Sequence, residues 1–416
     1  MVANLQIYFS GGTFMINAVG IDVSKGYSTV AIVNSLGKVT VSPFDVNHTV
    51  SELGRLADNL KILQGETKIV MEATGIYYLP IANALHAAGL KVYAVNPILI
   101  NEFGNNSIRK RKNDKADARK MGRYAIANWY ELPPEYIPEE DIRQILKAVS
   151  RQYSKYNKVK TMLTNNLISL LDRSFPGINQ LFTSSAREKD GHEKWIDFAA
   201  RFWHADCVAG LTPKAFAESY RKWCKRMGYY PVGMDDIHAF ARQCVPAMPK
   251  SDNTKMLITC AVAQVNAVAE TLNVTGAEMN RLAKLLPEYE IAIGLYGVGK
   301  ILGPQLIAEV GDVLRFPKKS TLVAFAGLEP TDNDSGQLQG KKPISKKGSP
   351  HLRKTLFQIM DCLLRLSPVN DPVYQLLDRK RAEGKHYYSY MCAGSAKLLR
   401  IYYAKVKEHL SKLDDI

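Results

Sequence analysis

The sequence has few cysteines, and none of them forms a motif for metal or redox chemistry. Six cysteines are scattered through 416 residues without a C-x-x-C pair. In a chain of this length, that usage is typical of reduced cytosolic thiols rather than of a disulfide framework. His204 and Cys207 have a ligand-like spacing, but no second pair stands at a zinc-site distance. We therefore expect no zinc site.

Signals for membrane insertion and export are also missing. No uninterrupted apolar run approaches the ~18 residues of a transmembrane helix. No basic segment precedes an apolar stretch near the N-terminus, which predicts that there is no signal peptide. Residues 1–14 carry no pattern and are left out of the fold prediction. These absences predict a cytoplasmic protein.

Positive charge is what the sequence has in excess. The net charge is +15 and the pI is about 9.3. A protein this basic usually meets a polyanion, either nucleic acid or an anionic membrane. Because no basic amphipathic helix stands out, we favour nucleic acid and an association with the nucleoid. The hydrophobic fraction of 46% is enough for true cores, and the length suits two or three domains.

The first third of the chain alternates between strand and helix patterns. Three β-rich runs joined by short turns predict an antiparallel meander, and helices alternate with strands after it. The predicted strands are 16–23, 27–33, 39–41, 68–71 and 92–95, and the predicted helices are 50–63, 77–88 and 115–128. This order predicts an α/β domain, a mixed sheet with helices on its faces.

The rest of the chain reads as helical. Apolar residues fall seven apart from Ile142 to Leu170, which predicts a long helix that ends at Pro176. That helix could be a coiled coil or an ordinary core helix. Prolines at 133, 134 and 138 mark a boundary before it. The predicted domains are 15–130 (α/β), 139–288 (the long helix and a helical middle region) and 289–416 (mostly helical).

Four carboxylates form the candidate catalytic site. Asp22 and Glu72 stand at the ends of two predicted strands, and two converging negative charges require a metal ion or a proton. Asp114 and Asp117 have the i, i+3 spacing that puts both on one face at the start of a helix. A turn-forming Asp22 and a helix-capping Asp114 are the structural alternatives. Together the four could bind two Mg²⁺ or Mn²⁺ ions for phosphoryl transfer.

Basic residues surround these acids and a second segment further along. A solvated surface is the alternative for each group, but a phosphate backbone drawn to the metals would need such cations. The candidate nucleic-acid contacts are Lys25, Arg109, Lys110, Arg111, Lys112, Lys115, Lys341, Lys342, Lys346, Lys347 and Arg353.

These motifs resemble the DEDD transposases of the insertion sequence 110 group. The matching segments surround Asp22 (GIDVSK), Glu72 (MEATG) and the Asp114–Asp117 pair (KNDKADA), and a C-terminal set follows at 295–300, 325–336 and 346–353. The resemblance implies an N-terminal domain of the RuvC branch of the RNase H fold. It also implies that the four acids are metal ligands and that Ser335 is a nucleophile.

Two C-terminal motifs can also be interpreted from their residues alone. Asp334-Ser335-Gly336 suits a polar turn, and a serine held there could form a covalent phosphoserine link. The segment from Gly294 to Lys300 fits a phosphate-binding loop, but Ile301 replaces the Ser or Thr that would bind Mg²⁺. We expect instead that Gly297, Gly299 and Lys300 contact a nucleic-acid backbone between two helices.

The resemblance extends to partners. It implies donor and target double-stranded DNA, a structured guide RNA that pairs with both, and a homo-oligomer, a dimer or tetramer, in which the long helix is a natural contact. Two alternatives stay open: a RuvC-like structure-specific endonuclease that uses water, and a non-catalytic nucleic-acid-binding protein. A role at the membrane surface is the weakest of the interpretations.

Overall fold

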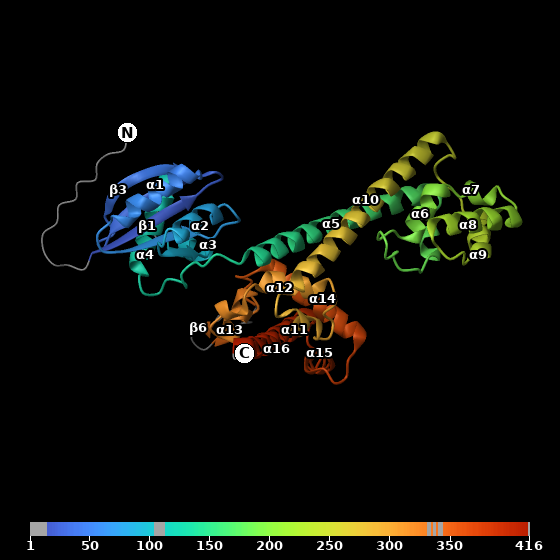
Figure 1. Cartoon of the computed structure of the whole chain (residues 1–416). Helices are drawn as coiled ribbons and strands as arrows, with labels where there is room; N and C mark the ends of the chain where they lie inside the picture. The colour runs from blue at the N-terminus through green and yellow to red at the C-terminus, as the bar shows by residue number, and fades with distance from the viewer. Residues whose placement is uncertain (1–14, 104–112, 331–333, 336–337, 340–343, 415–416) are drawn as a thin grey trace. The chain divides into compact units, whose positions relative to one another are not determined.

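The computed structural model describes residues 15–103, 113–330, 334–335, 338–339 and 344–414. Arg109 to Lys112, Lys341 and Lys342, all predicted nucleic-acid contacts, lie outside the described residues. The chain divides into two compact units, Met1–Glu139 and Glu140–Ile416 (Figure 1).

The first unit contains the predicted mixed sheet. Its strands are β1 (Ile16–Val23), β2 (Tyr27–Asn34), β3 (Val39–Asn47), β4 (Glu66–Glu72) and β5 (Val92–Val95). Their order is β3-β2-β1-β4-β5, with β1, β2 and β3 antiparallel and β4 and β5 parallel to β1. The predicted fold class is confirmed. β3 extends past the predicted 39–41 because it is an edge strand, where Pro43 costs no ladder hydrogen bond.

Helices cover both faces of this sheet. On one face, α1 (Val50–Lys61) and α2 (Leu79–Ala87) pack on Ile21 and Met71. On the other, α3 (Pro97–Phe103) and α4 (Asp114–Ala127) pack on Ala18 and Val70. Because side chains alternate along a strand, each strand contributes to two separate cores.

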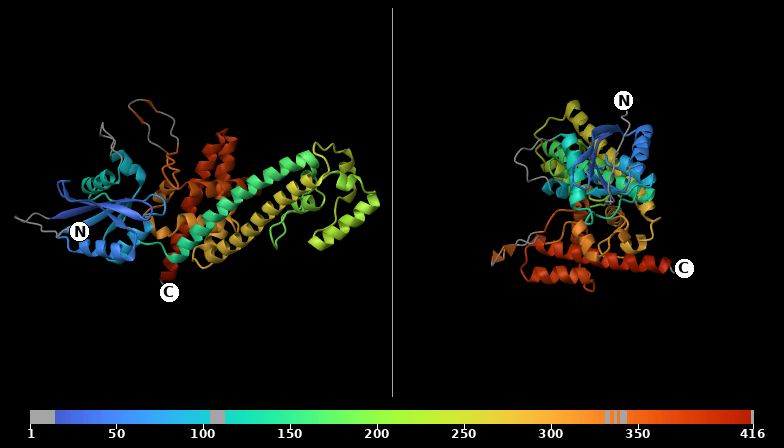
Figure 2. Two further views of the ribbon diagram at one scale, coloured as in Figure 1. Left: turned by 90° about the horizontal axis from the view of Figure 1, so that it is seen from above. Right: turned by 90° about the vertical axis from the view of Figure 1, so that its left-hand side faces the viewer.

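Two long antiparallel helices run side by side through the second unit, as Figures 1 and 2 show. They are α5 (Asp141–Ser174) and α10 (Asp252–Ala283), each about 50 Å long at 1.5 Å per residue. The long helix that the heptads predict is confirmed. Within the described residues, its main helical partner is α10 of the same chain, and α12 also packs on it.

One hydrophobic core lies at each end of this helix pair. At the C-terminal end of α5, the middle core gathers η1 (Ile178–Leu181), α6 (Lys194–Arg201), α7 (Asp206–Ala209), α8 (Pro213–Met227) and α9 (Met234–Gln243). Trp203 and Trp223 are buried in it, and Trp195 is partly buried.

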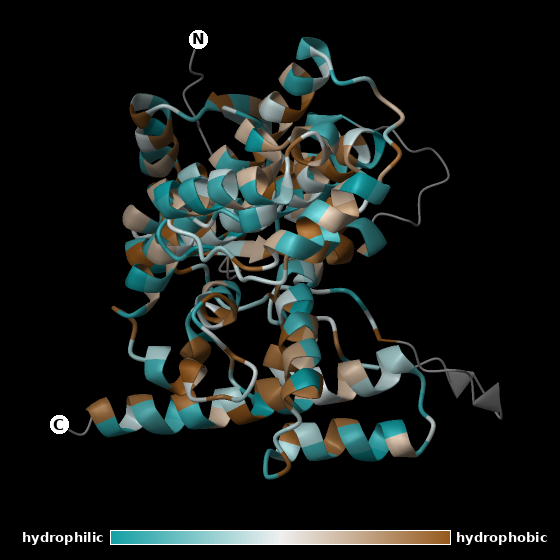
Figure 3. Cartoon of the chain, turned by 90° about the vertical axis from the view of Figure 1, so that its right-hand side faces the viewer, coloured by the Kyte–Doolittle hydropathy of each residue, from teal (hydrophilic) through white to brown (hydrophobic). Residues whose placement is uncertain are grey.

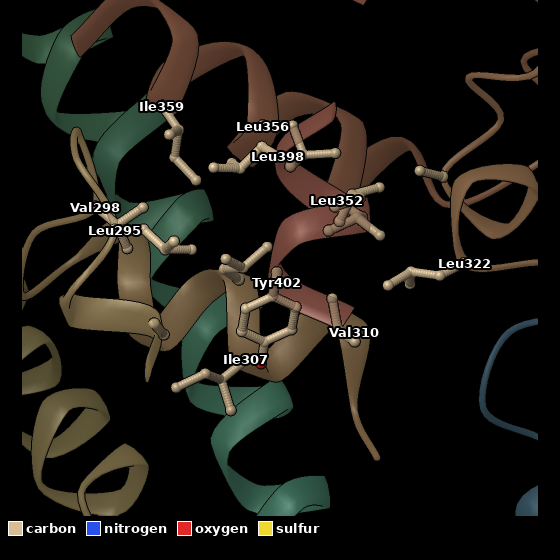
Figure 4. Packing of buried hydrophobic residues seen from close by; sticks show 14 of the residues in the cluster. Leu295, Val298, Ile307, Val310, Leu322, Leu352, Leu356, Ile359, Leu398 and Tyr402 are labelled. Atoms are coloured by element: carbon tan, nitrogen blue, oxygen red, sulfur yellow. The ribbon is translucent and has the colours of Figure 1, made fainter. Parts of the chain in front are cut away.

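At the N-terminal end of α5 lies the C-terminal core, in which Tyr402 is fully buried beside Ile307 and Val310 (Figure 4). Its elements are α11 (Tyr289–Ile293), α12 (Leu302–Val310), η2 (Val313–Arg315), α13 (Lys319–Phe325), α14 (Pro350–Leu366), α15 (Pro372–Ala382) and α16 (Tyr387–Asp414).

Helix α10 is long and apolar enough to cross a membrane by length and composition alone. Its sequence contains no long uninterrupted apolar run, because Gln264, Asn266 and Asn273 interrupt it. Its buried residues recur every three or four positions, the spacing of a helix packed along one side. Alternating apolar and polar bands are visible along the helices in Figure 3. The packing of α10 on α5 is that of a core helix.

Candidate active site

Two neighbouring strand ends carry the first pair of acids. β1 and β4 are parallel and adjacent, and their register pairs Gly20 with Val70 and Ile21 with Met71. The next residue of each strand is Asp22 and Glu72, and both are half-buried. The carboxyl ends of parallel strands meet at one edge of a sheet, so the two carboxylates lie at the same edge.

Both carboxylates belong to the face of the sheet that α4 covers. Ala18 and Val70 pack in the core formed with α4, and side chains at every second position share a face. Asp22 and Glu72 are therefore on the α4 side. Ile21 and Met71 point to the opposite core, below α1 and α2.

Helix α4 brings the second pair of acids to this edge because two glycines let it lie directly on β1. A Cβ on Gly20 would stand 2.1 Å from the Ala118 carbonyl oxygen, and one on Gly122 would stand 3.5 Å from the Ala18 carbonyl oxygen. Helix α4 therefore lies along β1, with Gly122 beside Ala18 and Ala118 beside Gly20. The turn of α4 that precedes Ala118 lies further in the same direction, toward Asp22.

That first turn of α4 contains Asp114 and Asp117, which are both half-buried. The helix cap is Asn113, whose Oδ1 accepts a 2.8 Å hydrogen bond from the Ala116 backbone N–H. The capping role that the sequence allowed for Asp114 was wrong, since Asn113 takes it. The Asp114 carboxylate is therefore not used as the cap.

Hydroxyl groups from the neighbouring turns and strands bind these and nearby carboxylates. Tyr27, at the start of β2, donates a 3.0 Å hydrogen bond to Oδ2 of Asp114. Thr74 donates to Oε1 of Glu72. Thr29, opposite Asp22 in the β1–β2 register, donates a 2.6 Å bond to Asp45. Sequence reasoning missed the role of Tyr27, because no local signal connects positions that lie 87 residues apart.

The fold collects carboxylates at one edge without closing them into a cluster. Within the described part of the chain, which includes all four acids, no group of three His, Cys, Asp or Glu side chains is arranged to hold a metal ion. The donors gathered there are all oxygen atoms, the chemistry that Mg²⁺ and Mn²⁺ prefer and zinc does not.

Ser335 lies in the second unit, in a short β-hairpin. β6 (Asp334–Ser335) pairs antiparallel with β7 (Leu338–Gln339). The sequence favoured a polar turn here, whereas in the structure Ser335 is paired with Leu338 in a short β-ladder. An isolated bridge pairs Pro330 with Ile344 on either side of this hairpin. The part of the chain between these two residues is called the Ser335 arm below.

Backbone hydrogen bonds join the two chain segments at the base of the Ser335 arm. The Lys346 backbone N–H donates to the Gly327 carbonyl at 3.1 Å, and the Ser349 backbone N–H donates to the Phe325 carbonyl at 2.7 Å. Arg353, a predicted nucleic-acid contact, donates from Nη1 to the Ala326 carbonyl at 2.8 Å. The two segments that flank the arm are thus bound to each other.

The other predicted contact residues lie in different surroundings. Lys25, Lys115, Lys346 and Lys347 are exposed. Lys300 lines a groove between α5 and α10 with a volume of about 390 Å³. A Cβ on Gly297, whose φ is +76°, would meet the Ile359 carbonyl oxygen at 3.0 Å, so packing on α14 already requires this glycine. Gly299 has open space around its Cα.

Comparison with known families adds an independent line of argument. Residues 19–176 match a transposase family of the DEDD, IS110 type, and residues 290–375 match the transposase IS116/IS110/IS902 family. The chain belongs to the IS110-type transposases. The first match contains all four acids, and the second contains Ser335.

Relatives of this transposase match most of the chain. The pilin gene-inverting protein of Moraxella bovis is 23% identical over 345 residues, 82% of this chain and 80% of that protein. The insertion element IS116 protein of Streptomyces clavuligerus is 23% identical over 374 residues, 88% of each chain. The structure of T. thermophilus RuvC in complex with a Holliday junction substrate covers 28% of this transposase and 96% of RuvC, at 15% identity and a TM-score of 0.22.

Proposed function

We propose that this transposase cuts and rejoins DNA strands with divalent metal ions held by Asp22, Glu72, Asp114 and Asp117. The observation that carries the proposal is the common edge of the sheet to which two strand ends and the first turn of α4 bring these carboxylates. Bound Mg²⁺ or Mn²⁺ would stabilise the charge that develops on the attacking and leaving oxygens of phosphoryl transfer. Tyr27 and Thr74 would orient Asp114 and Glu72 as ligands.

Ser335 is the proposed nucleophile. Its Oγ forms a bond to a DNA phosphorus, and the bond from that phosphorus to one sugar oxygen breaks. The serine loses its proton, and the leaving sugar oxygen gains one. A sugar hydroxyl of the partner strand then attacks the phosphoserine, which restores the DNA backbone and releases the serine. Because a phosphoester bond is kept throughout, rejoining needs no outside energy source. The hydrogen-bonded base of the Ser335 arm supports the proposed role of Ser335 as nucleophile.

The proposed partners are donor and target DNA duplexes and a structured guide RNA. Sequence recognition would then reside in base pairing, while the protein holds nucleic-acid backbones and shapes. The net charge of +15 supports extensive backbone contact. We propose a dimer or tetramer in which the acids of one subunit meet the Ser335 arm of another, acting in the bacterial cytoplasm at the nucleoid.

The experiment that tests the nucleophile is a covalent trap. Labelled donor DNA is incubated with the full-length protein, Mg²⁺ and the element's own RNA, and denaturing gels are used to look for labelled protein. Ser335→Ala should abolish both the adduct and strand exchange. Ser320→Ala, at an exposed serine of α13, should leave both unchanged. Continued cleavage by Ser335→Ala would show that water is the nucleophile, as in a RuvC-like nuclease.

A further inference from the structure

Helix α8 in the middle core carries an unusual exposed face. Five of its cations and one acid are exposed: Lys214, Glu218, Arg221, Lys222, Lys225 and Arg226. At 100° per residue, these positions cover less than half of the helix circumference. The charged face runs ~18 Å along the axis, from Lys214 to Arg226.

None of the five cations has an ion-pair partner among the described residues. The ion pairs of the middle core use other cations, such as Arg187 with Asp190 and Lys160 with Glu193. Arg221 and Lys225 stand four residues apart, as do Lys222 and Arg226, and like charges at that spacing repel each other. Glu218 stands four residues from both Lys214 and Lys222 and offsets part of this repulsion, but five cations and one acid leave the face with a net charge of +4, which a bound polyanion would neutralise.

The rest of α8 holds this face outward. Phe216 and Tyr220 are fully buried and stack on each other, and Tyr220 stacks on Trp223. Thr212 caps the N-terminus, and Gly228, with a φ of +75°, ends the helix. Because its apolar side is fixed in the core, α8 cannot turn that side toward a lipid surface. The five cations of α8 therefore remain on its solvent-exposed side whether or not a ligand is bound.

We propose that the basic face of α8 is a binding surface for the phosphate backbone of duplex DNA. DNA is the polyanion that a transposase must hold, and ~18 Å of duplex carries about ten phosphate charges. α5 links the two cores: Leu146 lies in the C-terminal core and Leu171 in the middle core. The rise between them is ~38 Å, or about eleven base pairs. Within the second unit, this surface is thus separate from the C-terminal core that carries Ser335, and it would hold DNA that flanks the exchange site.

The test measures binding of a labelled 30-base-pair DNA duplex to full-length protein by fluorescence anisotropy in a salt series. The variant Arg221→Gln/Lys222→Gln/Lys225→Gln is compared with Arg400→Gln/Lys405→Gln/Lys407→Gln, which neutralises three exposed cations of α16. Loss of three phosphate contacts should lower the slope of log K against log salt by about 2.7 and weaken binding on the order of 100-fold at 0.1 M salt. The α16 variant should change neither.

A gain-of-affinity variant complements this loss. Glu218 lies among the cations of α8, so Glu218→Gln should tighten binding several-fold without changing any cation. Thermal melts of every variant report folding, and each variant should melt close to wild type because its substitutions lie on an exposed helix face. Equal affinities and slopes for the two triple variants would overturn the proposal. So would a loss confined to an RNA duplex of the same sequence.

Discussion

The Tyr27 hydroxyl donates a 3.0 Å hydrogen bond to Oδ2 of Asp114, joining the start of β2 to the first turn of α4. Tyr27 is 36% exposed, so the bond adds little to stability, but it sets the direction of a proposed metal ligand. We therefore expect the loss of this hydrogen bond to change the Mg²⁺ dependence of cleavage rather than the stability of the fold.

Replacing this tyrosine tests that orientation. Tyr27→Phe should raise the Mg²⁺ concentration for half-maximal cleavage and lower the cleavage rate about fivefold to tenfold, the effect of one lost hydrogen bond. The unfolding midpoint should stay within a degree or two. Tyr130→Phe, at a tyrosine that is 95% exposed, is the matched control. An unchanged Mg²⁺ dependence in Tyr27→Phe would remove the positioning role.

Loss of a carboxylate should separate chemistry from binding. Asp117→Asn keeps the size of the side chain and removes its charge, so we expect strand cleavage to fall by at least about 1000-fold while DNA affinity is kept. EDTA should have the same effect on the wild-type protein, and Mn²⁺ should restore activity. Full activity in EDTA would rule out the metal mechanism, and an unfolded Asp117→Asn would point to a structural aspartate.

The contact between α4 and β1 should be intolerant of added volume. Gly20→Ala places a methyl group 2.1 Å from the Ala118 carbonyl oxygen, so α4 must move away from the sheet, at a cost of about 3 kcal/mol. Cleavage should be lost even where the variant stays folded, since Asp114 and Asp117 move with the helix. Gly54→Ala in α1, with no atom within 4 Å of the new methyl, should instead stabilise by about 0.5–1 kcal/mol. Urea unfolding compares the two.

A buried ion pair in the second unit should be costly to break. The Arg143 guanidinium binds both carboxylate oxygens of Glu288, and their side chains are 9% and 1% exposed. Glu288→Gln removes the buried partner of Arg143 and leaves it paired with the solvent-exposed Glu140, so the change should destabilise by about 3–5 kcal/mol. The corresponding change in the exposed pair, Glu278→Gln beside Arg281, should cost far less, because solvent screens this pair. Similar losses in both variants would contradict the role of burial.

Acid should weaken the first unit through His48. Burial lowers the pKa of His48 below its usual 6.5, and its Nε2 lies 2.8 Å from the hydroxyl of the fully buried Ser28. The unfolded chain therefore takes up this proton at a higher pH than the folded chain. The stability from a neutral His48 is complete above pH 6.5 and is lost as the pH falls through the lower folded value. Melting temperatures of His48→Gln and wild type from pH 8 to 5 should converge on the acid side.

Local pattern predicted much of the first unit. Apolar β-rich runs with a glycine at the turns placed β1, β2 and β5 closely, and the acids at the ends of β1 and β4 followed from the strand boundaries. The proximity of Asp22 and Glu72 was conditional on the two strands being neighbours, which is a tertiary fact that the β1–β4 register supplies. The length of α5 followed from its heptads.

What the sequence could not predict depends on contacts between distant segments. Asn113 and Asp114 are both good helix caps, and only the backbone at the start of α4 decides between them. The heptads of α5 predicted an apolar seam but not its partner, which lies some hundred residues later in α10. The basic face of α8 could not be predicted because its cations are interleaved in the sequence with Trp223 and Cys224, which are buried in the folded helix.

One uninterrupted backbone, α5, enters both cores of the second unit. Neither core can loosen without releasing a segment that anchors the other, so the two should unfold together rather than as independent modules. A force applied to one core would also be transmitted to the other through α5, because one continuous helix rather than a flexible linker connects them.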